Sequence, residues 1–296
     1  MTKIVVLGGV SYDTILHLSA LPEPRPQNVY AQRTLEMVGS TGSGKAVNLH
    51  QLGFEVVFHG LIGEDEYGER VERYFAQKGL PFIYDVDPQG TERHINLIDP
   101  HGGRISIYAQ SASFEPHIQW SHIEPHIADC DLVALNIINY CREAIPLIKQ
   151  SGKPIWCDIH DYDGRNPYHQ EFIDAADVIQ MSSDALPEYR PLMEKFIAQG
   201  KQLVICTHGK DGAEALTAAG KWHTQPIITA FDPIDTNGAG DSFFSGVLFG
   251  QLHGHTLADS LKLGALTSAL CVASAEIAHP ELTADGLIGQ LQRMAQ

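Results

Sequence analysis

The chain alternates between short apolar runs and longer stretches with helical periodicity. The apolar runs predict strands, and the stretches that follow them predict helices. We expect strands at 3–10, 55–61, 131–135, 154–158, 177–180 and 202–207. We expect helices at 45–52, 66–78, 141–150, 168–176, 184–199, 240–252, 256–274 and 283–294. Short buried strands alternating with helices are typical of βαβ units, so the sequence predicts an α/β fold with a mostly parallel sheet covered on both faces.

Two stretches, 28–38 and 83–108, break this alternation because they lack helical periodicity. Four apolar residues of the second stretch alternate with polar neighbours: Ile95, Leu97, Ile105 and Ile107. The turn Asp-Pro-His-Gly-Gly at 99–103 separates them into two halves and predicts a hairpin. A few strands bury little surface by themselves, so we expect a small β-sheet that forms a lid above a cleft or a dimer surface. An ordinary edge hairpin fits the same pattern.

The chain shows no internal repeat, low-complexity tract or long linker. We therefore expect one domain, residues 1–296, with lid segments at about 11–43 and 83–110. A chain of 296 residues can bury about three quarters of the surface that its unfolded form exposes. Its core therefore needs no disulfide or metal to hold it together.

The balance of charges limits the classes of partner. Twenty Lys and Arg against 36 Asp and Glu give a net charge of −16. Nucleic acids and anionic membranes both need clustered basic residues, so we expect neither as a partner. The five cysteines are an odd number without C-x-x-C spacing, which argues against a disulfide framework and against a zinc site. The N-terminal apolar run is too short for a signal peptide or a membrane span, and we expect a cytoplasmic protein.

The most informative segment is Asp-Thr-Asn-Gly-Ala-Gly-Asp at 235–241, directly before an apolar helix. Gly238, Ala239 and Gly240 carry almost no side chain, so an anion can approach the free N–H groups at the helix start. Capping of the helix would account for one acid at this position, either Asp235 or Asp241. It does not account for two acids on either side of a turn with almost no side chains. N–H donors beside a carboxylate suit phosphoryl transfer, in which the donors hold the phosphoryl oxygens and the acid accepts a proton.

This segment resembles the D-T-x-G-A-G-D signature of the ribokinase (pfkB-type) carbohydrate kinase family at every fixed position. The resemblance implies a ribokinase-like three-layer α/β sandwich that uses ATP and Mg²⁺ to phosphorylate a hydroxyl group, of hydroxymethyl type, on a sugar or nucleoside. It also implies that Asp241 is the catalytic base and that the N–H groups of Gly238, Ala239, Gly240 and Asp241 form the anion hole. An alcohol is far less acidic than a carboxyl group of pKa about 3.9, so Asp241 would take the proton late in the reaction.

A second glycine-rich segment, 39–45, allows two interpretations. In the first interpretation, it matches the G-x-x-x-x-G-K motif of a P-loop, which predicts a nucleotide hydrolase. The strand that ends at Asp158 could then serve as the acidic strand that such an enzyme needs. However, Ala46 stands where a P-loop needs Ser or Thr. The segment also resembles the N-terminal signature of the kinase family, which implies that Gly44 and Asn48 bind the sugar hydroxyls. For Lys45, a solvated side chain fits the pattern at least as well as a functional one.

Other residues extend the resemblance along the chain. Asp13 follows the first strand, where a carboxyl group can bind sugar hydroxyls or simply cap a turn. The resemblance implies that Asp13 binds the substrate. It implies the same for Asn136, which departs from the family because many sugar kinases carry an acid that touches the substrate at this position. It also implies that Thr207 and Gly209, in a T-x-G-x-x-G turn, line the ATP site.

The sequence also departs from the family pattern. Ser182 and Ala185 replace the Asn and Glu of the family's N-x-x-E element, which leaves the residues that organise Mg²⁺ unassigned. A non-catalytic sugar or nucleoside sensor with the same fold is therefore a third hypothesis. Residues 274–280 lack the glycine often found near the family's monovalent-cation loop, so the resemblance assigns no residues to a potassium site. His122 and His126, spaced i, i+4, fit a solvated helix face. The family also suggests a homodimer formed through the lid.

Overall fold

The computed structural model describes residues 1–101, 103–231 and 234–294. The strands are β1 (Lys3–Leu7), β2 (Ser11–His17), β3 (Arg33–Gly39), β4 (Glu55–Ile62), β5 (Phe82–Val86), β6 (Arg93–Ile98), β7 (Arg104–Gln110), β8 (Leu132–Asn136), β9 (Ile155–Asp158), β10 (Val178–Ser182), β11 (Leu203–Thr207), β12 (Ala213–Thr217) and β13 (Trp222–Gln225). The α-helices are α1 (Thr41–Gln51), α2 (Glu66–Lys78), α3 (Glu124–Asp129), α4 (Cys141–Ser151), α5 (Gln170–Ala175), α6 (Tyr189–Ala198), α7 (Ala239–Leu252), α8 (Leu257–Val272) and α9 (Ala284–Met294). Short 3-10 helices are η1 (Trp120–His122), η2 (Pro167–His169) and η3 (Gly209–Asp211).

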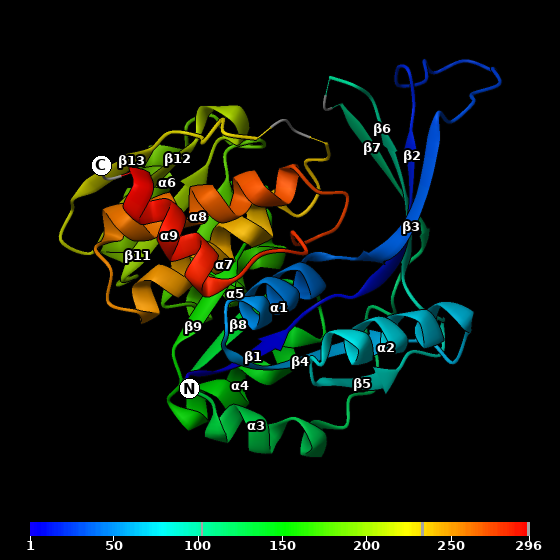
Figure 1. The fold of residues 1–296 in the computed structure, drawn as a ribbon. Coiled ribbons are helices and arrows are strands. Elements are labelled where there is room, and N and C mark those ends of the chain that lie inside the picture. The colour runs from blue at the N-terminus through cyan, green and yellow to red at the C-terminus, as the bar shows by residue number, and fades with distance from the viewer. Residues whose placement is uncertain (102, 232–233, 295–296) are drawn as a thin grey trace.

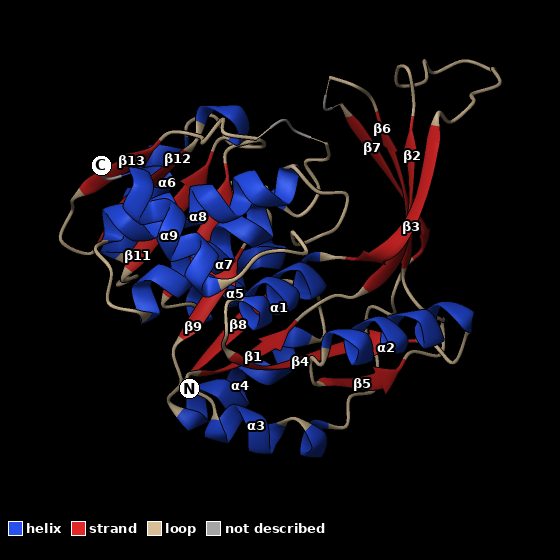
Figure 2. Cartoon of the chain, viewed as in Figure 1, coloured by secondary structure: helices blue, strands red, loops and turns tan. Residues whose placement is uncertain are grey.

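The large sheet is the middle layer of a three-layer sandwich (Figures 1 and 2). Its strand order within the described residues is β13-β12-β11-β10-β9-β8-β1-β4-β5. All neighbouring strands from β11 to β5 run parallel, whereas β12 and β13 add an antiparallel hairpin at one edge. The predicted α/β fold, with a mostly parallel sheet, is confirmed.

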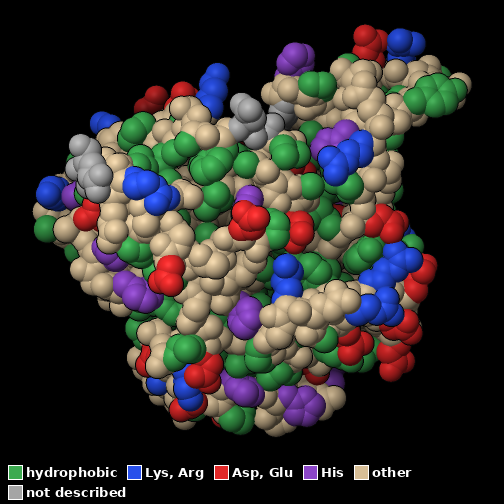
Figure 3. Space-filling view, in the orientation of Figure 1, with side chains coloured by type: hydrophobic (Ala, Val, Ile, Leu, Met, Phe, Trp, Pro, Cys, Tyr) green, Lys and Arg blue, Asp and Glu red, His purple; other side chains and the backbone are tan. Residues whose placement is uncertain are grey.

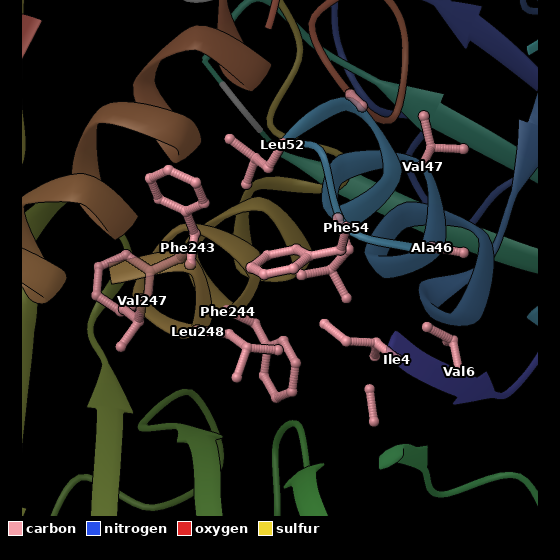
Figure 4. Close-up of a cluster of buried hydrophobic side chains, with 14 of the residues drawn as sticks. Ile4, Val6, Ala46, Val47, Leu52, Phe54, Phe243, Phe244, Val247 and Leu248 are labelled. Carbon is pink, nitrogen blue, oxygen red and sulfur yellow. The ribbon is translucent and has the colours of Figure 1, made fainter. Parts of the chain in front are cut away.

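Strand β1 shows why the strands of the large sheet are continuous apolar runs in the sequence. Ile4 and Val6 belong to the core beneath α1, α2, α7, α8 and α9. Val5 and Leu7 belong to the core on the other face, beneath α3, α4, α5 and α6. A strand covered on both faces needs apolar residues at every position. Figure 4 shows how side chains of α1 (Ala46, Val47) and α7 (Phe244, Leu248) pack above β1.

The small sheet stands apart from the body (Figure 1) and has the order β3-β2-β6-β7. Strands β6 and β7 form the predicted hairpin, with Ile95 opposite Ile107 and Leu97 opposite Ile105. Position 102 of the predicted turn lies outside the described residues. The apolar alternation therefore marks one face of this sheet, as expected of a sheet exposed on one side.

The structure differs from the sequence predictions in several details. Phe82–Val86 pairs with β4 in the large sheet and not with the small one, because its residues cover the edge of the main core. Asp13 lies inside β2 and not in a turn after the first strand. The hairpin of β12 and β13 was not predicted. The helix expected from residue 184 begins at Tyr189, since residues 183–188 form a turn at the end of β10.

The surface carries both charges side by side. Over α2, acidic and basic side chains alternate in Figure 3, and Arg70 pairs there with Glu36 and Glu66 at 2.8 and 3.3 Å. The described helices include none with the length and apolar character needed to cross a lipid bilayer.

Candidate active site

An ion cluster inside the molecule joins the two glycine-rich segments. Lys45 lies in α1, Asp241 lies in the first turn of α7 and Asp158 ends β9. The ammonium group of Lys45 donates a hydrogen bond to Oδ1 of Asp241 and lies 3.2 Å from Oδ2 of Asp158. The Lys45 side chain is only 1% exposed, so the interpretation of this residue as solvated is wrong. The cause is that α1 begins at Thr41 and turns Lys45 inward against α7.

The two carboxyl groups of this cluster differ in basicity. Burial raises the pKa of Asp241, and the nearby Lys45 offsets this effect only in part. Burial also acts on Asp158, but the positive charges of His160 and Lys45 outweigh it and lower the pKa of that carboxyl group. Burial opposes the charge on Lys45 as well, yet the two carboxylates raise the pKa of Lys45 and keep it protonated. Asp241 is therefore the better proton acceptor of the two acids.

Open space adjoins the first backbone N–H groups of α7. Within the described residues, the N–H groups of Gly240 and Asp241 have no hydrogen-bond partner. A Cβ atom added to Gly240 would meet no atom within 4 Å. Gly238 caps the helix with a φ of 77°, a left-handed conformation that favours glycine. The helix start thus offers free donors and a partial positive charge to an anion.

Two further residues hold this helix start in place. The Nε2 atom of Gln180 donates to Oδ2 of Asp158 at 3.2 Å and to the carbonyl oxygen of Gly240 at 3.0 Å. Sequence analysis missed Gln180, although a Gln inside the buried strand β10 was a signal that could have found it. A Cβ atom on Gly44 would lie 2.8 Å from Oδ2 of Asp241. Gly44 thus lets α1 approach the Asp241 carboxylate closely.

Asn48 joins α1 to α7 through its buried amide. Its Nδ2 donates to the carbonyl oxygens of Gly44 at 2.8 Å and Ile277 at 3.3 Å. Its Oδ1 accepts from the hydroxyl of Ser242 at 3.3 Å. The side chain is fully buried. These contacts give Asn48 a structural role beside the ion cluster, and its predicted contact with a sugar stays a prediction.

Polar side chains line one face of the small sheet around Asp13. Oδ1 of Asp13 lies 3.3 Å from Nδ1 of His94, and the other ring nitrogen of His94 lies 3.1 Å from Glu92. The amide of Asn96 donates to Oδ2 of Asp13 at 3.4 Å, and the ring of Tyr108 lies 4.2 Å from that of His94. Burial opposes the charged form of His94, but the two carboxylates outweigh it and raise the pKa of His94 to about 9. This face therefore carries a cation held between two acids.

Unpaired polar atoms surround the Gly8–Gly9 turn after β1. The amide of Asn136 donates to the carbonyl oxygen of Leu7 at 2.8 Å. Within the described residues, no partner faces Oδ1 of Asn136 or the hydroxyls of Ser11 and Ser43, and all three side chains are buried. Buried groups of this kind normally have a hydrogen-bond partner. Hydroxyls and amides are suitable partners for a polyol.

The predicted nucleotide residues lie at the same edge of the sheet, at the end of β11. The hydroxyl of Thr207 donates to the carbonyl oxygen of Met181 at 3.4 Å, and Gly209 begins η3 with a φ of 52°. Their contact with ATP stays a prediction. Near them, Asp184 is exposed and its backbone N–H donates to the hydroxyl of Ser182. Among the described residues, no three His, Cys, Asp or Glu side chains are grouped so that they could hold a metal ion.

The structure does not support the P-loop interpretation of residues 39–45. A P-loop follows a strand of the main parallel sheet and wraps around phosphates before its Lys. Here the preceding strand β3 belongs to the small sheet, and the helix begins at Thr41. The Lys45 ammonium group is already held by Asp241 and Asp158.

Comparisons with known proteins agree with this geometry. The sequence profile of the pfkB family carbohydrate kinases matches residues 1–284. Acarbose 7(IV)-phosphotransferase from Actinoplanes sp. is 31% identical over 273 residues, which cover 90% of this chain and 91% of the relative. Fructoselysine 6-kinase from Escherichia coli is 26% identical over 82% of this chain and 92% of its own length.

Solved structures show the same fold. The microbiome-derived acarbose kinase Mak1 superposes with a TM-score of 0.88 at 27% identity, covering 99% of both chains. Arabidopsis thaliana ribokinase, complexed with ribose and ATP, has a TM-score of 0.82 at 20% identity and also covers 99% of both chains. The fold, the profile match and the arrangement of the two glycine-rich segments lead to one conclusion: the chain belongs to the pfkB family of carbohydrate kinases.

Proposed function

We propose that this kinase transfers the γ-phosphoryl group of ATP to a hydroxymethyl group of a sugar, with Asp241 as the base. The observation that carries this proposal is that Asp241 lies in the first turn of α7, where the N–H groups of Gly240 and Asp241 are free within the described residues. These two N–H groups, together with those of Gly238 and Ala239, would stabilise the charge on the transferred phosphoryl oxygens, although the N–H of Ala239 donates to the carbonyl oxygen of Thr236 at 3.3 Å in this structure. A sugar is favoured over a nucleoside because relatives such as acarbose 7(IV)-phosphotransferase and fructoselysine 6-kinase are named as kinases of sugars or sugar derivatives.

The acceptor hydroxyl oxygen gains the phosphoryl group and loses its proton in the same step. The acceptor oxygen forms a bond to the γ-phosphorus while the bond to the departing ADP oxygen breaks, and the hydroxyl proton passes to Asp241. Lys45 keeps Asp241 ionised before the reaction, while the burial of Asp241 makes it a stronger base than an exposed carboxylate. Mg²⁺ enters as part of the MgATP substrate.

We assign the sugar to the space beside the Gly8–Gly9 turn, between the body and the small sheet. Asp13, Gly44, Asn48 and Asn136 would form this site, and the unpaired oxygen of Asn136 supports the assignment. Thr207 and Gly209 would contact ATP farther along the same edge of the large sheet. The small sheet would act as a lid that excludes water, which otherwise competes with the sugar as acceptor.

The outer face of the small sheet supports a homodimer. Ile95, Leu97, Ile105 and Ile107 lie on this face as two cross-strand pairs, and Ile105 and Ile107 are 38% and 46% exposed. Pairing two such faces would bury an apolar surface that a monomer leaves in water. Sedimentation should then show a dimer for the native chain and a monomer for Ile107→Lys.

The proposed reaction consumes ATP, which fits a cytoplasmic location for the enzyme.

Replacing Asp241 tests the proposed function. Asp241→Asn should lower kcat by about 10²–10⁴-fold because the general base is lost, while MgATP binding is retained. Asp158→Asn is the matched control, since it removes the other acid that contacts Lys45 and leaves the proton acceptor in place. Its loss of kcat should be much smaller. Near-normal turnover in Asp241→Asn, or equal losses in both variants, would contradict the assignment of Asp241 as base.

A further inference from the structure

A cavity of about 550 Å³ opens at the protein surface. Its walls come from the segment that follows β7, with Phe114, Glu115 and His117, and from the start of α4, with Asn139, Arg142 and Glu143. None of these residues has a place in the phosphoryl transfer described above. The volume lies within the range of about 300–1,000 Å³ that is usual for small-molecule sites.

Both walls continue from residues of the proposed sugar site. On one side, Ala112 donates to Glu92, which contacts His94 next to Asp13, and Phe114 follows two residues later. On the other side, Asn136 leads to Ile138, whose Cδ1 lies 3.8 Å from the place of a Cβ atom on Gly9, and then to Asn139. The amide of Asn139 donates to the carbonyl oxygen of Phe114 at 2.6 Å and joins the two walls. Both walls of the cavity therefore begin within a few residues, along the chain, of the proposed acceptor site.

The polar groups of the cavity are fixed before any ligand binds. Nη1 of Arg142 donates to Oδ1 of Asn139 at 2.7 Å, and Nη2 donates to the carbonyl oxygen of Tyr168. The guanidinium group stacks 4.1 Å from the centre of the Tyr168 ring. The carboxylate of Glu143 accepts from the indole of Trp120 at 3.1 Å. Pre-organised polar groups of this kind lose little entropy on binding.

The balance of groups indicates a neutral, hydroxylated ligand. Glu115 and Glu143 together outweigh the charge of Arg142, which disfavours a phosphate or a second nucleotide. The ring of Phe114 is 61% exposed at the wall and so presents an apolar face to the cavity. A pyranose or furanose ring presents C–H groups to such an aromatic face and hydroxyls to planar side chains like Asn, Arg and Glu.

We propose that this cavity binds a second sugar ring, so that the acceptor is a glycosidically extended sugar and not a free monosaccharide. This inference rests on the proposed function. The first ring presents its hydroxymethyl group to Asp241, and the second ring lies on Phe114 between Asn139 and Glu143.

Matched acceptor pairs test the proposal. ADP release from MgATP is measured with each sugar as acceptor. D-glucose is compared with maltose and with cellobiose, and D-fructose is compared with sucrose. We expect kcat/KM to be at least about tenfold higher for an extended member than for its monosaccharide. Phe114→Ala should remove most of that advantage and leave the monosaccharide value within about twofold. Met294→Ala, which trims another exposed apolar side chain on α9, is the control and should change neither value.

The outcomes separate this inference from the proposed function. A monosaccharide used as well as its extended partners, or a Phe114→Ala variant that keeps the preference, would overturn the second-ring site. A loss shared equally by both members of a pair would also overturn it, since Phe114 would then act on the common acceptor site. No ADP release with any sugar, from a protein that binds MgATP, would instead contradict the proposed function.

Discussion

Lys45 and Asp241, which are 196 positions apart in the sequence, form an ion pair inside the protein. The pair joins α1 to the first turn of α7 and so holds the two glycine-rich segments against each other. Removing both charges from water costs free energy, and a buried pair is often no more stabilising than apolar residues of similar size. We therefore attribute the pair to the proposed chemistry of the site, in which Lys45 would keep Asp241 ionised, and not to stability alone.

Lys45→Met is expected to shift the pH dependence of catalysis. The variant keeps the apolar stem of the side chain but removes the charge that favours ionised Asp241, so the pKa of Asp241 rises further. Because Asp241 acts as a base only when it is deprotonated, the acid limb of the kcat profile should move to higher pH. Initial rates at saturating substrate between pH 5 and 9 measure this shift. An unchanged acid limb would show that Lys45 does not influence the base.

The same variant should lose stability as the pH rises. Without Lys45, Asp158 and Asp241 are two buried carboxyl groups that the folded protein holds protonated more readily than the unfolded chain does. A raised pKa in the folded state makes stability decrease with increasing pH. We expect a deficit of about 3 kcal/mol at neutral pH that narrows toward pH 5, measured by urea unfolding. The double variant Lys45→Met/Asp158→Asn should recover part of this deficit, because only one acid then remains.

Local patterns in the sequence were sufficient to predict the alternating strands and helices, the hairpin at Ile95 and Ile107, and the turn before α7. Each of these depends on residues close together in the chain. The partner of Lys45 depends on how α1 rotates against α7, which no local pattern encodes. Gln180 was missed for the same reason, since its importance comes from two contacts, with Asp158 and with Gly240, that exist only after folding.

Gly44→Ala is expected to displace the Asp241 carboxylate, the proposed base. The added Cβ would lie 2.8 Å from Oδ2 and 3.2 Å from Cγ of Asp241, and both distances are too short for unstrained contact. A misplacement of about 1 Å at a reacting group can cost about 10²-fold in rate, and we expect a loss of kcat of that order. Steady-state kinetics together with thermal unfolding will check it. Wild-type kcat in a folded variant would mean that the Asp241 position is not critical.

Gly240→Ala examines the anion hole without disturbing the protein around it. The new methyl group meets no protein atom within 4 Å, and Ala is favoured over Gly in a helix by about 0.5–1 kcal/mol. Stability should therefore stay constant or rise slightly. If the phosphoryl group occupies this space, KM for MgATP should rise and kcat fall. Gly289→Ala in α9 is the matched control, with its nearest contact at 3.5 Å, and should leave both constants unchanged.

His94 makes the small sheet sensitive to alkaline pH. Its pKa is raised to about 9 in the folded protein from an ordinary value of 6.5, so its charge stabilises the fold fully below pH 6.5 and is lost as the pH rises through 9. Deprotonation also removes a charge partner of Asp13. We expect the stability advantage of the native protein over His94→Gln to shrink between pH 7 and 10, together with a rise in KM for the sugar in the native protein. Thermal unfolding and initial rates across this range test both effects. A constant difference in stability would show that His94 is neutral between Asp13 and Glu92.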